Sequence, residues 1–193
     1  MARPTCRDAL VALPFMLGIA GIAGGSGCSG HDPYRPGEGV GAFHVTSKLV
    51  STTCGPTPDP WEFDVKLRHD ATTLFWVQGS APISGQLDAT ARAVMKTSVV
   101  NTVRAADAKT QTPACTMSRT DVVDLVLAPA TAPSMTAADV DAATSFKGTL
   151  GYRFIAVDGS SCEDQLTDSG GDFAVLPCAV SYEITATRTG EAK

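Results

Sequence analysis

The chain has 193 residues, enough for one domain with a substantial core and a leader segment. Its hydrophobic content of 44% and charged content of 18% exclude a disordered chain and a bundle of membrane helices. The formal net charge of −5 argues against a nucleic-acid-binding protein, because phosphate recognition requires a basic surface.

The first 27 residues have the pattern of a secretory signal peptide. Arg3 and Arg7 precede an apolar run over residues 9–23, and small residues follow up to Cys28. The run has about 15 residues, fewer than the ~20 that cross a bilayer as a helix. We therefore predict that residues 1–27 are removed after export.

Gly25-Ser26-Gly27 before Cys28 resembles the lipobox of bacterial lipoproteins, with Gly25 in place of the usual Leu. In that family the cysteine carries the lipid, so the resemblance implies a membrane anchor on Cys28. Ser29 follows the cysteine instead of Asp, which by the sorting rule of this family implies an outer-membrane address. The alternative is a soluble secreted or periplasmic protein. Residues 28–39 are rich in Gly and Pro, and we predict a flexible tether there.

Alternating apolar and polar residues predict an antiparallel sheet within residues 40–190. The clearest strand is 61–68, where four apolar side chains share one face and four charged side chains share the other. The other predicted strands are residues 40–53, 73–77, 83–88, 92–104, 115–128, 146–157 and 174–187. Thr136 and Asp139 are spaced like a capping box, which predicts one short helix over residues 134–143.

Eight strands joined mostly by short turns predict an all-β domain. A single antiparallel up-and-down meander barrel is favoured, because closure removes both exposed edges of the sheet. A two-sheet β-sandwich is the alternative. Strand number, domain size and Gly41-Ala42-Phe43, where lipocalins carry Gly-x-Trp, resemble the lipocalin-like barrels. The resemblance implies the architecture alone, because Phe43 replaces the Trp and no ligand-binding residue is carried over.

Four cysteines remain after the predicted cleavage and lipidation, and an exported protein with an even number is expected to form disulfides, here two. In chain order they follow the first strand, begin the sixth, follow the seventh and begin the eighth: Cys54, Cys115, Cys162 and Cys178. Alternating strand directions therefore place all four at one end of the barrel. The favoured pairing is Cys162–Cys178, which closes the last hairpin loop, with Cys54–Cys115. Cys54–Cys178 with Cys115–Cys162 is the alternative, since the first and eighth strands are neighbours in a closed barrel. A zinc site is not predicted without Cys-x-x-Cys spacing.

Five aromatic residues are predicted to face the barrel interior: Trp61, Phe63, Tyr152, Phe154 and Tyr182. They would either line a small ligand pocket or fill the barrel, and the width of an eight-stranded barrel allows both. We favour filling by a small margin.

Other candidate groups do not converge in the sequence. His31, His44 and His69 fall in the tether, a strand and a turn, so no metal or acid–base site is predicted from them. A loop over residues 158–172 lacks the EF-hand spacing of a calcium site, and we predict a solvated loop. Its acidic residues are Asp158, Glu163, Asp164, Asp168 and Asp172. The sequence contains no recognisable catalytic motif, so neither an enzyme nor a cofactor is predicted.

The favoured function is a membrane-tethered binding module for a small apolar ligand or a protein partner. The alternative is an envelope lipoprotein with a structural or interaction role and no ligand cavity. A sizeable cavity lined by the five aromatic residues would favour the first function, and a fully packed interior would favour the second.

Overall fold

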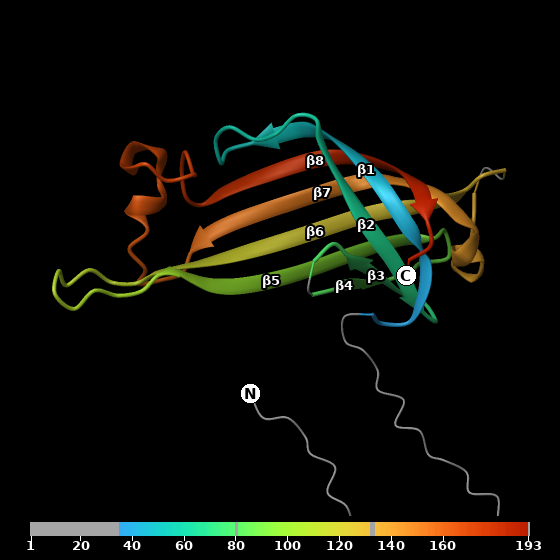
Figure 1. Ribbon diagram of the computed structural model, residues 1–193, viewed down its shortest axis with the longest axis horizontal. Coiled ribbons are helices and arrows are strands. Elements are labelled where there is room, and N and C mark those ends of the chain that lie inside the picture. The colour runs from blue at the N-terminus through green and yellow to red at the C-terminus, as the bar shows by residue number, and fades with distance from the viewer. Residues whose placement is uncertain (1–34, 80, 132–133, 193) are drawn as a thin grey trace, which may run out of the picture. The chain divides into compact units, whose positions relative to one another are not determined.

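A computed structural model describes residues 35–79, 81–131 and 134–192, which all lie in one compact unit, His31–Lys193 (Figure 1). The strands are β1 Glu38–Thr52, β2 Trp61–Asp70, β3 Thr73–Val77, β4 Ile83–Gln86, β5 Arg92–Arg104, β6 Cys115–Pro129, β7 Ala143–Ala156 and β8 Cys178–Gly190. Three short 3₁₀ helices are η1 Ala137–Ala142, η2 Glu163–Gln165 and η3 Thr167–Ser169. The predicted signal peptide and Cys28 lie outside the described residues.

The eight strands form one antiparallel sheet in the order β4-β3-β2-β1-β8-β7-β6-β5. Consecutive strands pair with each other except β4 and β5, and β1 pairs with β8, for example Val45 with Ala186. The sheet curls into a nearly closed up-and-down barrel, so the predicted all-β meander barrel is confirmed and the β-sandwich alternative is wrong. The barrel begins at Glu38, because Arg68 donates hydrogen bonds to the carbonyls of Pro36 and Gly37 and holds the entering chain.

The core follows the predicted alternation. Phe43 and Val45 of β1 are fully buried in the same core as Phe146 and Trp76, whose ring centroids are 5.8 Å apart. Phe43 and Phe146 are also in contact, at 5.3 Å between ring centroids. Burial of these rings and of the aliphatic residues around them is the main favourable contribution to the fold.

Several predicted elements differ from the structure at their ends, among them the eighth strand and the short helix. The eighth strand begins at Cys178 instead of residue 174, because Pro177 has no N–H to donate to a neighbouring strand. The predicted short helix is the 3₁₀ helix η1. Thr136 precedes it but does not cap its backbone, since its hydroxyl donates instead to the carboxylate of Asp139 at 2.8 Å.

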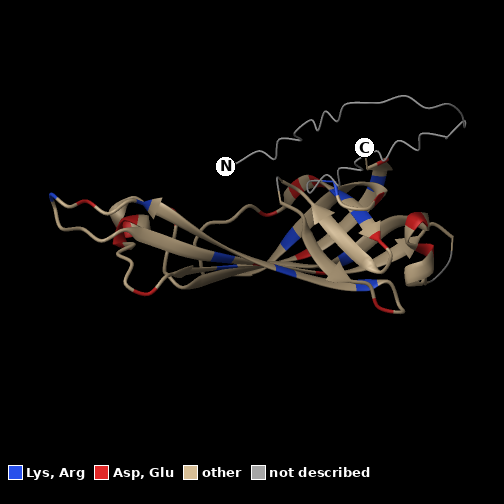
Figure 2. Cartoon of the chain, turned by 90° about the horizontal axis from the view of Figure 1, so that it is seen from below, with Lys and Arg blue, Asp and Glu red and all other residues tan. Residues whose placement is uncertain are grey.

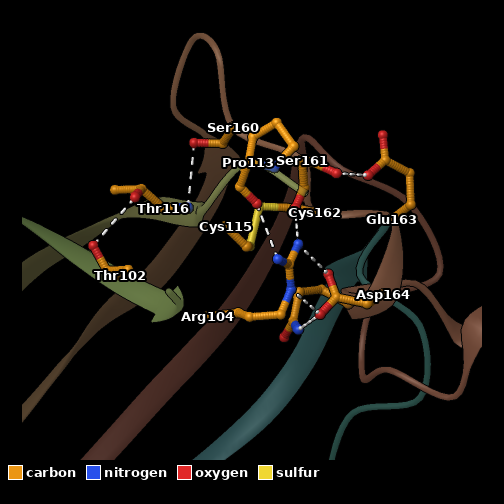
Figure 3. The surroundings of a disulfide bond; sticks show 11 residues. Thr102, Arg104, Pro113, Cys115, Thr116, Ser160, Ser161, Cys162, Glu163 and Asp164 are labelled. Atoms are coloured by element: carbon orange, nitrogen blue, oxygen red, sulfur yellow. Dashed lines mark hydrogen bonds and ion pairs between the residues drawn. A yellow bond between two sulfur atoms is a disulfide. The ribbon is translucent and has the colours of Figure 1, made fainter. Parts of the chain in front are cut away.

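Two disulfides lie at one end of the barrel, as predicted, but the favoured pairing is wrong. The bonds are Cys54–Cys178 and Cys115–Cys162, the alternative pairing. Sheet neighbours decide the outcome: β1 lies beside β8, and the N–H of Thr53 donates to the carbonyl of Ala179 at 2.9 Å. Likewise the N–H of Ser161 donates to Ala114 at 3.1 Å, because the chain leaving β7 runs beside the start of β6. Figure 3 shows the Cys115–Cys162 bond in this setting.

The barrel closes only near the turn between β4 and β5. There Leu87 pairs with Ala93, and the N–H of Asp88 donates to the carbonyl of Arg92 at 2.8 Å. Gly85 permits this approach, because a Cβ at that position would overlap the carbonyl oxygen of Val94. β4 has four residues and β5 has thirteen, so β5 continues well beyond its short neighbour (Figure 1). The barrel is therefore closed at the end that holds the β4–β5 turn. At its other end it is split along the uncovered side of β5, and we call this the split end.

Candidate functional site

A cleft of about 620 Å³ opens where the barrel is split. One wall comes from β2, β3 and the β3–β4 loop, and the other from the inner faces of β5, β6 and β7. Its lining residues are Trp61, Trp76, Gln78, Gly79, Ala81, Ile83, Thr97, Val99, Asn101, Arg119, Asp121, Tyr152 and Phe154. This volume lies in the range of small-molecule binding sites.

The pattern that builds the core also builds the cleft. On β5, Ala93 and Met95 point inward and are buried in the closed end of the barrel. Two and four residues further on, Thr97 and Val99 point to the same side because side chains alternate with period two. Among the described residues no strand pairs with this side of β5 beyond the Leu87–Ala93 bridge, so these inward side chains become a wall of the cleft, which Ile83 of β4 also lines.

Three of the five predicted interior aromatics line the cleft, and two lie behind it. Trp61, Tyr152 and Phe154 are lining residues. Phe63 packs against Trp61 with 4.5 Å between ring centroids, and buried Tyr182 supports Trp61 from another side at 5.7 Å. The favoured prediction is a barrel interior filled by aromatic side chains. The closed end of the barrel is filled in this way, but the split end is hollow, so the prediction is wrong for that end.

The charged pair Arg119–Asp121 is the polar feature of the cleft, and the sequence analysis missed it. Nε of Arg119 donates to Oδ1 of Asp121 at 2.7 Å, and Nη2 donates to Oδ2 at 2.8 Å. Both residues belong to the inward-facing set of β6, which continues into Val123 and Leu125. The sequence signal for this pair is that Arg119 and Asp121 fall on the same alternating positions as the buried Val123 and Leu125.

The guanidinium of Arg119 also lies over the ring of Tyr152, with 4.6 Å from its central carbon to the ring centroid. Such cation–π contacts fix the position of both groups. Burial raises the pKa of the Tyr152 phenol well above its ordinary value, so the hydroxyl stays protonated at any physiological pH. The side chain of Arg119 is thus held by both Asp121 and Tyr152, which fixes the polar group of the cleft in place.

The histidines do not converge within the described part of the chain. His44 contacts Asp64 at 2.9 Å, and His69 contacts Asp141 at 3.1 Å on a different part of the barrel. His31 lies outside the described residues. In the ranges that the structure describes, no group of three or more His, Cys, Asp or Glu residues is placed to hold a metal ion.

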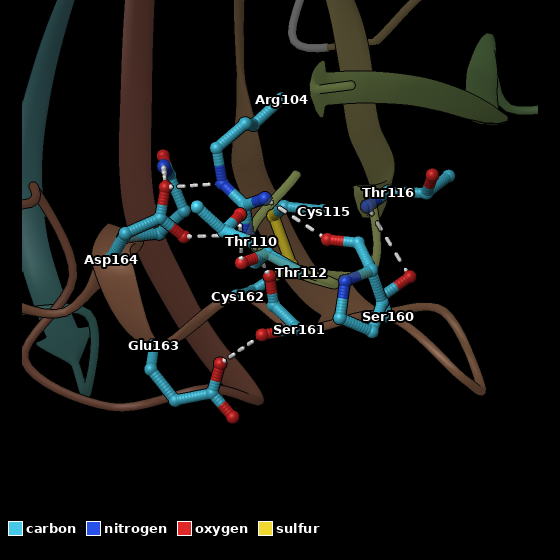
Figure 4. Close-up of polar contacts among 12 residues, drawn as sticks. Arg104, Thr110, Thr112, Cys115, Thr116, Ser160, Ser161, Cys162, Glu163 and Asp164 are labelled. Carbon is cyan, nitrogen blue, oxygen red and sulfur yellow. Dashed lines mark hydrogen bonds and ion pairs between the residues drawn. A yellow bond between two sulfur atoms is a disulfide. The ribbon is translucent and has the colours of Figure 1, made fainter. Parts of the chain in front are cut away.

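The acidic loop is tied to the disulfide end by Arg104 (Figure 4). Nε of Arg104 donates to Asp164 at 2.9 Å, and the same guanidinium donates to the carbonyls of Ser161 and Pro113. The hydrogen bond from Arg104 lowers the pKa of Asp164, and the hydroxyl of Ser161 lowers that of Glu163 in the same way. These contacts fasten the loop after β7 to the end of the β5–β6 hairpin, beside Cys115–Cys162, which indicates a structural role.

Comparisons with protein-family models, with curated proteins and with solved structures found no match for this chain. The function is therefore inferred from the residues and shape of the cleft. What the fold and the site define is a disulfide-bonded meander barrel with an aromatic cleft at its split end.

Proposed function

We propose that this protein is an exported binding module whose cleft accepts one amphipathic ligand. The observation that carries the proposal is the cleft of about 620 Å³, walled by Trp61, Tyr152 and Phe154 and holding one charged pair. A fully packed barrel would favour the alternative, an envelope protein with a structural role and no ligand cavity. The hollow end supports the binding function.

The lining indicates the chemistry of the ligand. The aromatic rings offer flat apolar surface, which favours a ligand with a planar or branched apolar part. Arg119 and Asp121 form an ion pair, so the lining adds no net charge and selects a ligand mainly by shape and apolar surface. A polar pair in an otherwise largely aromatic cleft favours a ligand that also carries a hydrogen-bonding group.

Binding is proposed here instead of catalysis. The only charged side chains among the lining residues are Arg119 and Asp121, and they are engaged with each other. A general acid or base needs a proton-transfer group free to face its substrate. The mutual bidentate pair serves better as a fixed polar anchor within the cleft.

The two disulfides indicate an oxidising, extracytoplasmic compartment. Among the described residues, no helix is long and apolar enough to cross a membrane. We propose that residues 1–27 are a signal peptide and that Cys28 carries a lipid anchor to the outer membrane, with a soluble periplasmic or secreted form as the alternative. Intact-mass measurement of the protein recovered from a lipoprotein-processing host tests this, since acylation adds a mass that Cys28→Ala abolishes.

Binding in the cleft is tested with the dye anilinonaphthalene sulfonate (ANS), which has an aromatic body and an acceptor group. Both tryptophans of the chain, Trp61 and Trp76, line the cleft, so energy transfer from tryptophan to the dye reports binding there. We expect saturable transfer at one dye per protein.

Thr97→Phe supplies the matched test, because it fills the cleft from β5, and it is expected to abolish the saturable transfer. Val94→Phe places the same ring on the opposite, exposed face of β5 and is expected to preserve it. Equal dye binding by both variants, or the absence of saturation in the natural protein, would contradict the proposed function.

A further inference from the structure

The second half of β5 has an edge that no described strand covers. In the register of β5 with β6, backbone groups alternate between pointing toward β6 and pointing away from it. The carbonyl of Ala91 accepts from Leu127 of β6, and the carbonyl of the next residue, Arg92, accepts from Asp88 on the other side. The even-numbered residues from Arg92 onward therefore direct their N–H and C=O groups away from β6.

The β5–β6 register is regular from Arg92 to Thr102, so the same alternation continues along it. The chain just after β4 pairs with β5 at Leu87 and Ala93, and Gly85 of β4 lies against Val94 and Met95. Past that point the outward-directed N–H and C=O groups belong to Lys96, Ser98, Val100 and Thr102. We call this side of β5, over residues 96–103, the free edge.

The side chains of the free edge suit strand pairing. Residues 97–103 read Thr-Ser-Val-Val-Asn-Thr-Val, with no charge, no Pro and no Gly. Val99, Val100 and Val103 are 47%, 60% and 51% exposed, so apolar side chains project on both faces of the strand. Exposed edge strands in soluble proteins are usually protected by charge, proline or a bulge, and this one has none of these from Thr97 to Thr102, after which its register with β6 shifts.

The free edge is also a wall of the cleft. Thr97, Val99 and Asn101 point inward from it and line the cleft with Tyr152 and Phe154. A chain that added to this edge would place every second side chain into the cleft and every other one outside. Figure 2 shows the β5–β6 hairpin extending from the barrel as a long ribbon.

We propose that the cleft binds an extended segment of another protein, which adds to the free edge of β5 as a further strand of the sheet. This inference rests on the proposed function and names its ligand as a peptide with apolar side chains at alternate positions. Backbone N–H and C=O groups of the peptide pair with Lys96, Ser98, Val100 and Thr102. Its inward side chains pack against the aromatic wall of the cleft.

The charge of β5 favours an acidic partner over a second copy of this chain. The strand has no acidic residue, and its Arg92 and Arg104 already pair with Asp124 and Asp164. Lys96 is exposed and makes no ion pair among the described residues, so a carboxylate on the outer face of the peptide complements it. Two copies paired about Val100 would instead place Lys96 opposite Arg104, which is held by Asp164, so the partner strand would offer Lys96 no carboxylate of its own.

The test is selection of peptides from a random ten-residue display library on the full mature protein, followed by binding measurements on the enriched peptides. Val100→Pro is the decisive variant, because it removes one N–H of the free edge and leaves the N–H groups directed to β6 intact. Val100→Thr keeps that N–H and is the matched control. Circular dichroism and ANS binding establish that each variant is folded with an intact cleft.

We expect enriched peptides with apolar residues at every second position, acidic residues between them and no central proline. Val100→Pro is expected to weaken peptide binding by roughly tenfold or more, because it removes a backbone hydrogen bond and its ring clashes with the added strand. Val100→Thr is expected to leave peptide binding unchanged. ANS binding is retained in both variants. If Val100→Pro does not fold, the natural protein is tested instead with peptides that are N-methylated at every second residue, in either of the two registers. The peptide whose methyl groups point toward β5 is expected to lose binding.

Three results would overturn the inference. One is no enrichment from the library while ANS still saturates, which leaves the proposed function standing and removes the peptide. A second is equal peptide binding by natural protein and Val100→Pro, or indifference to N-methylation. A third is a dimer in sedimentation experiments that Val100→Pro dissociates, which would assign the free edge to a second copy. Failure of ANS itself to saturate would instead contradict the proposed function.

Discussion

Replacing the disulfide cysteines in pairs tests the role of the two bonds at one end of the barrel. Cys54–Cys178 joins residues 124 apart in the sequence, and Cys115–Cys162 joins residues 47 apart inside that loop. The loop-entropy relation gives about 4 kcal/mol for the inner bond. With the inner bond kept, the outer one closes an effective loop of roughly 80 residues and contributes about 4.5 kcal/mol.

We therefore expect Cys54→Ser/Cys178→Ser and Cys115→Ser/Cys162→Ser to lose similar amounts of unfolding free energy, about 4 kcal/mol each. The assay is urea denaturation of both double variants and the natural protein without reductant, with the slope of each transition compared. Peptide mapping of the natural protein must also recover the two cross-linked pairs. A loss below about 1 kcal/mol in either variant would refute the entropic reasoning for that bond.

Two other variants test the seam and the charge pairs of the barrel. Gly85→Ala is expected to lose about 1–3 kcal/mol in urea denaturation, because its methyl group displaces β4 from the carbonyl of Val94. Gly79→Ala is the control, since a methyl group there meets open space, and a similar loss in both variants would contradict the role of close approach. For Asp124, the hydrogen bond from Arg92 lowers its pKa, so the stabilisation exists above the ordinary Asp pKa and disappears as pH falls through the lowered value. Asp124→Asn is therefore expected to lower the thermal midpoint at pH 7 and to have a smaller effect at pH 3, and an effect that grows toward acid would contradict this assignment.

The strands were the predictable part of this molecule. β5 runs from Arg92 to Arg104 and β3 from Thr73 to Val77, the same bounds that alternation predicts. Alternation works here because one face of each strand meets the core and the other meets water. The end of the barrel at which the cysteines gather was also predictable, since it needs only the alternating direction of successive strands.

The disulfide pairing and the cleft were not predictable in the same way. Cys162 and Cys178 are close in the sequence, which favours pairing them. The actual pairs instead join neighbouring strands of the sheet, and the β1–β8 neighbourhood exists only once the sheet has curled into a barrel. The cleft results from a mismatch in strand length, because β4 is too short to cover β5. Neither strand is unusual alone. The Arg119–Asp121 pair becomes a cleft feature only when the opposite wall is missing.

The most direct test of the binding cleft is the response of the two tryptophan indole N–H signals in a ¹H–¹⁵N spectrum during titration with ANS. Trp61 and Trp76 both line the cleft and are the only tryptophans of the chain, so their two signals report on it without assignment of the whole protein. The account predicts that both signals shift and reach saturation together at one equivalent of dye, and that Thr97→Phe suppresses the shifts. Signals that stay in place, or that drift without saturation, would contradict it.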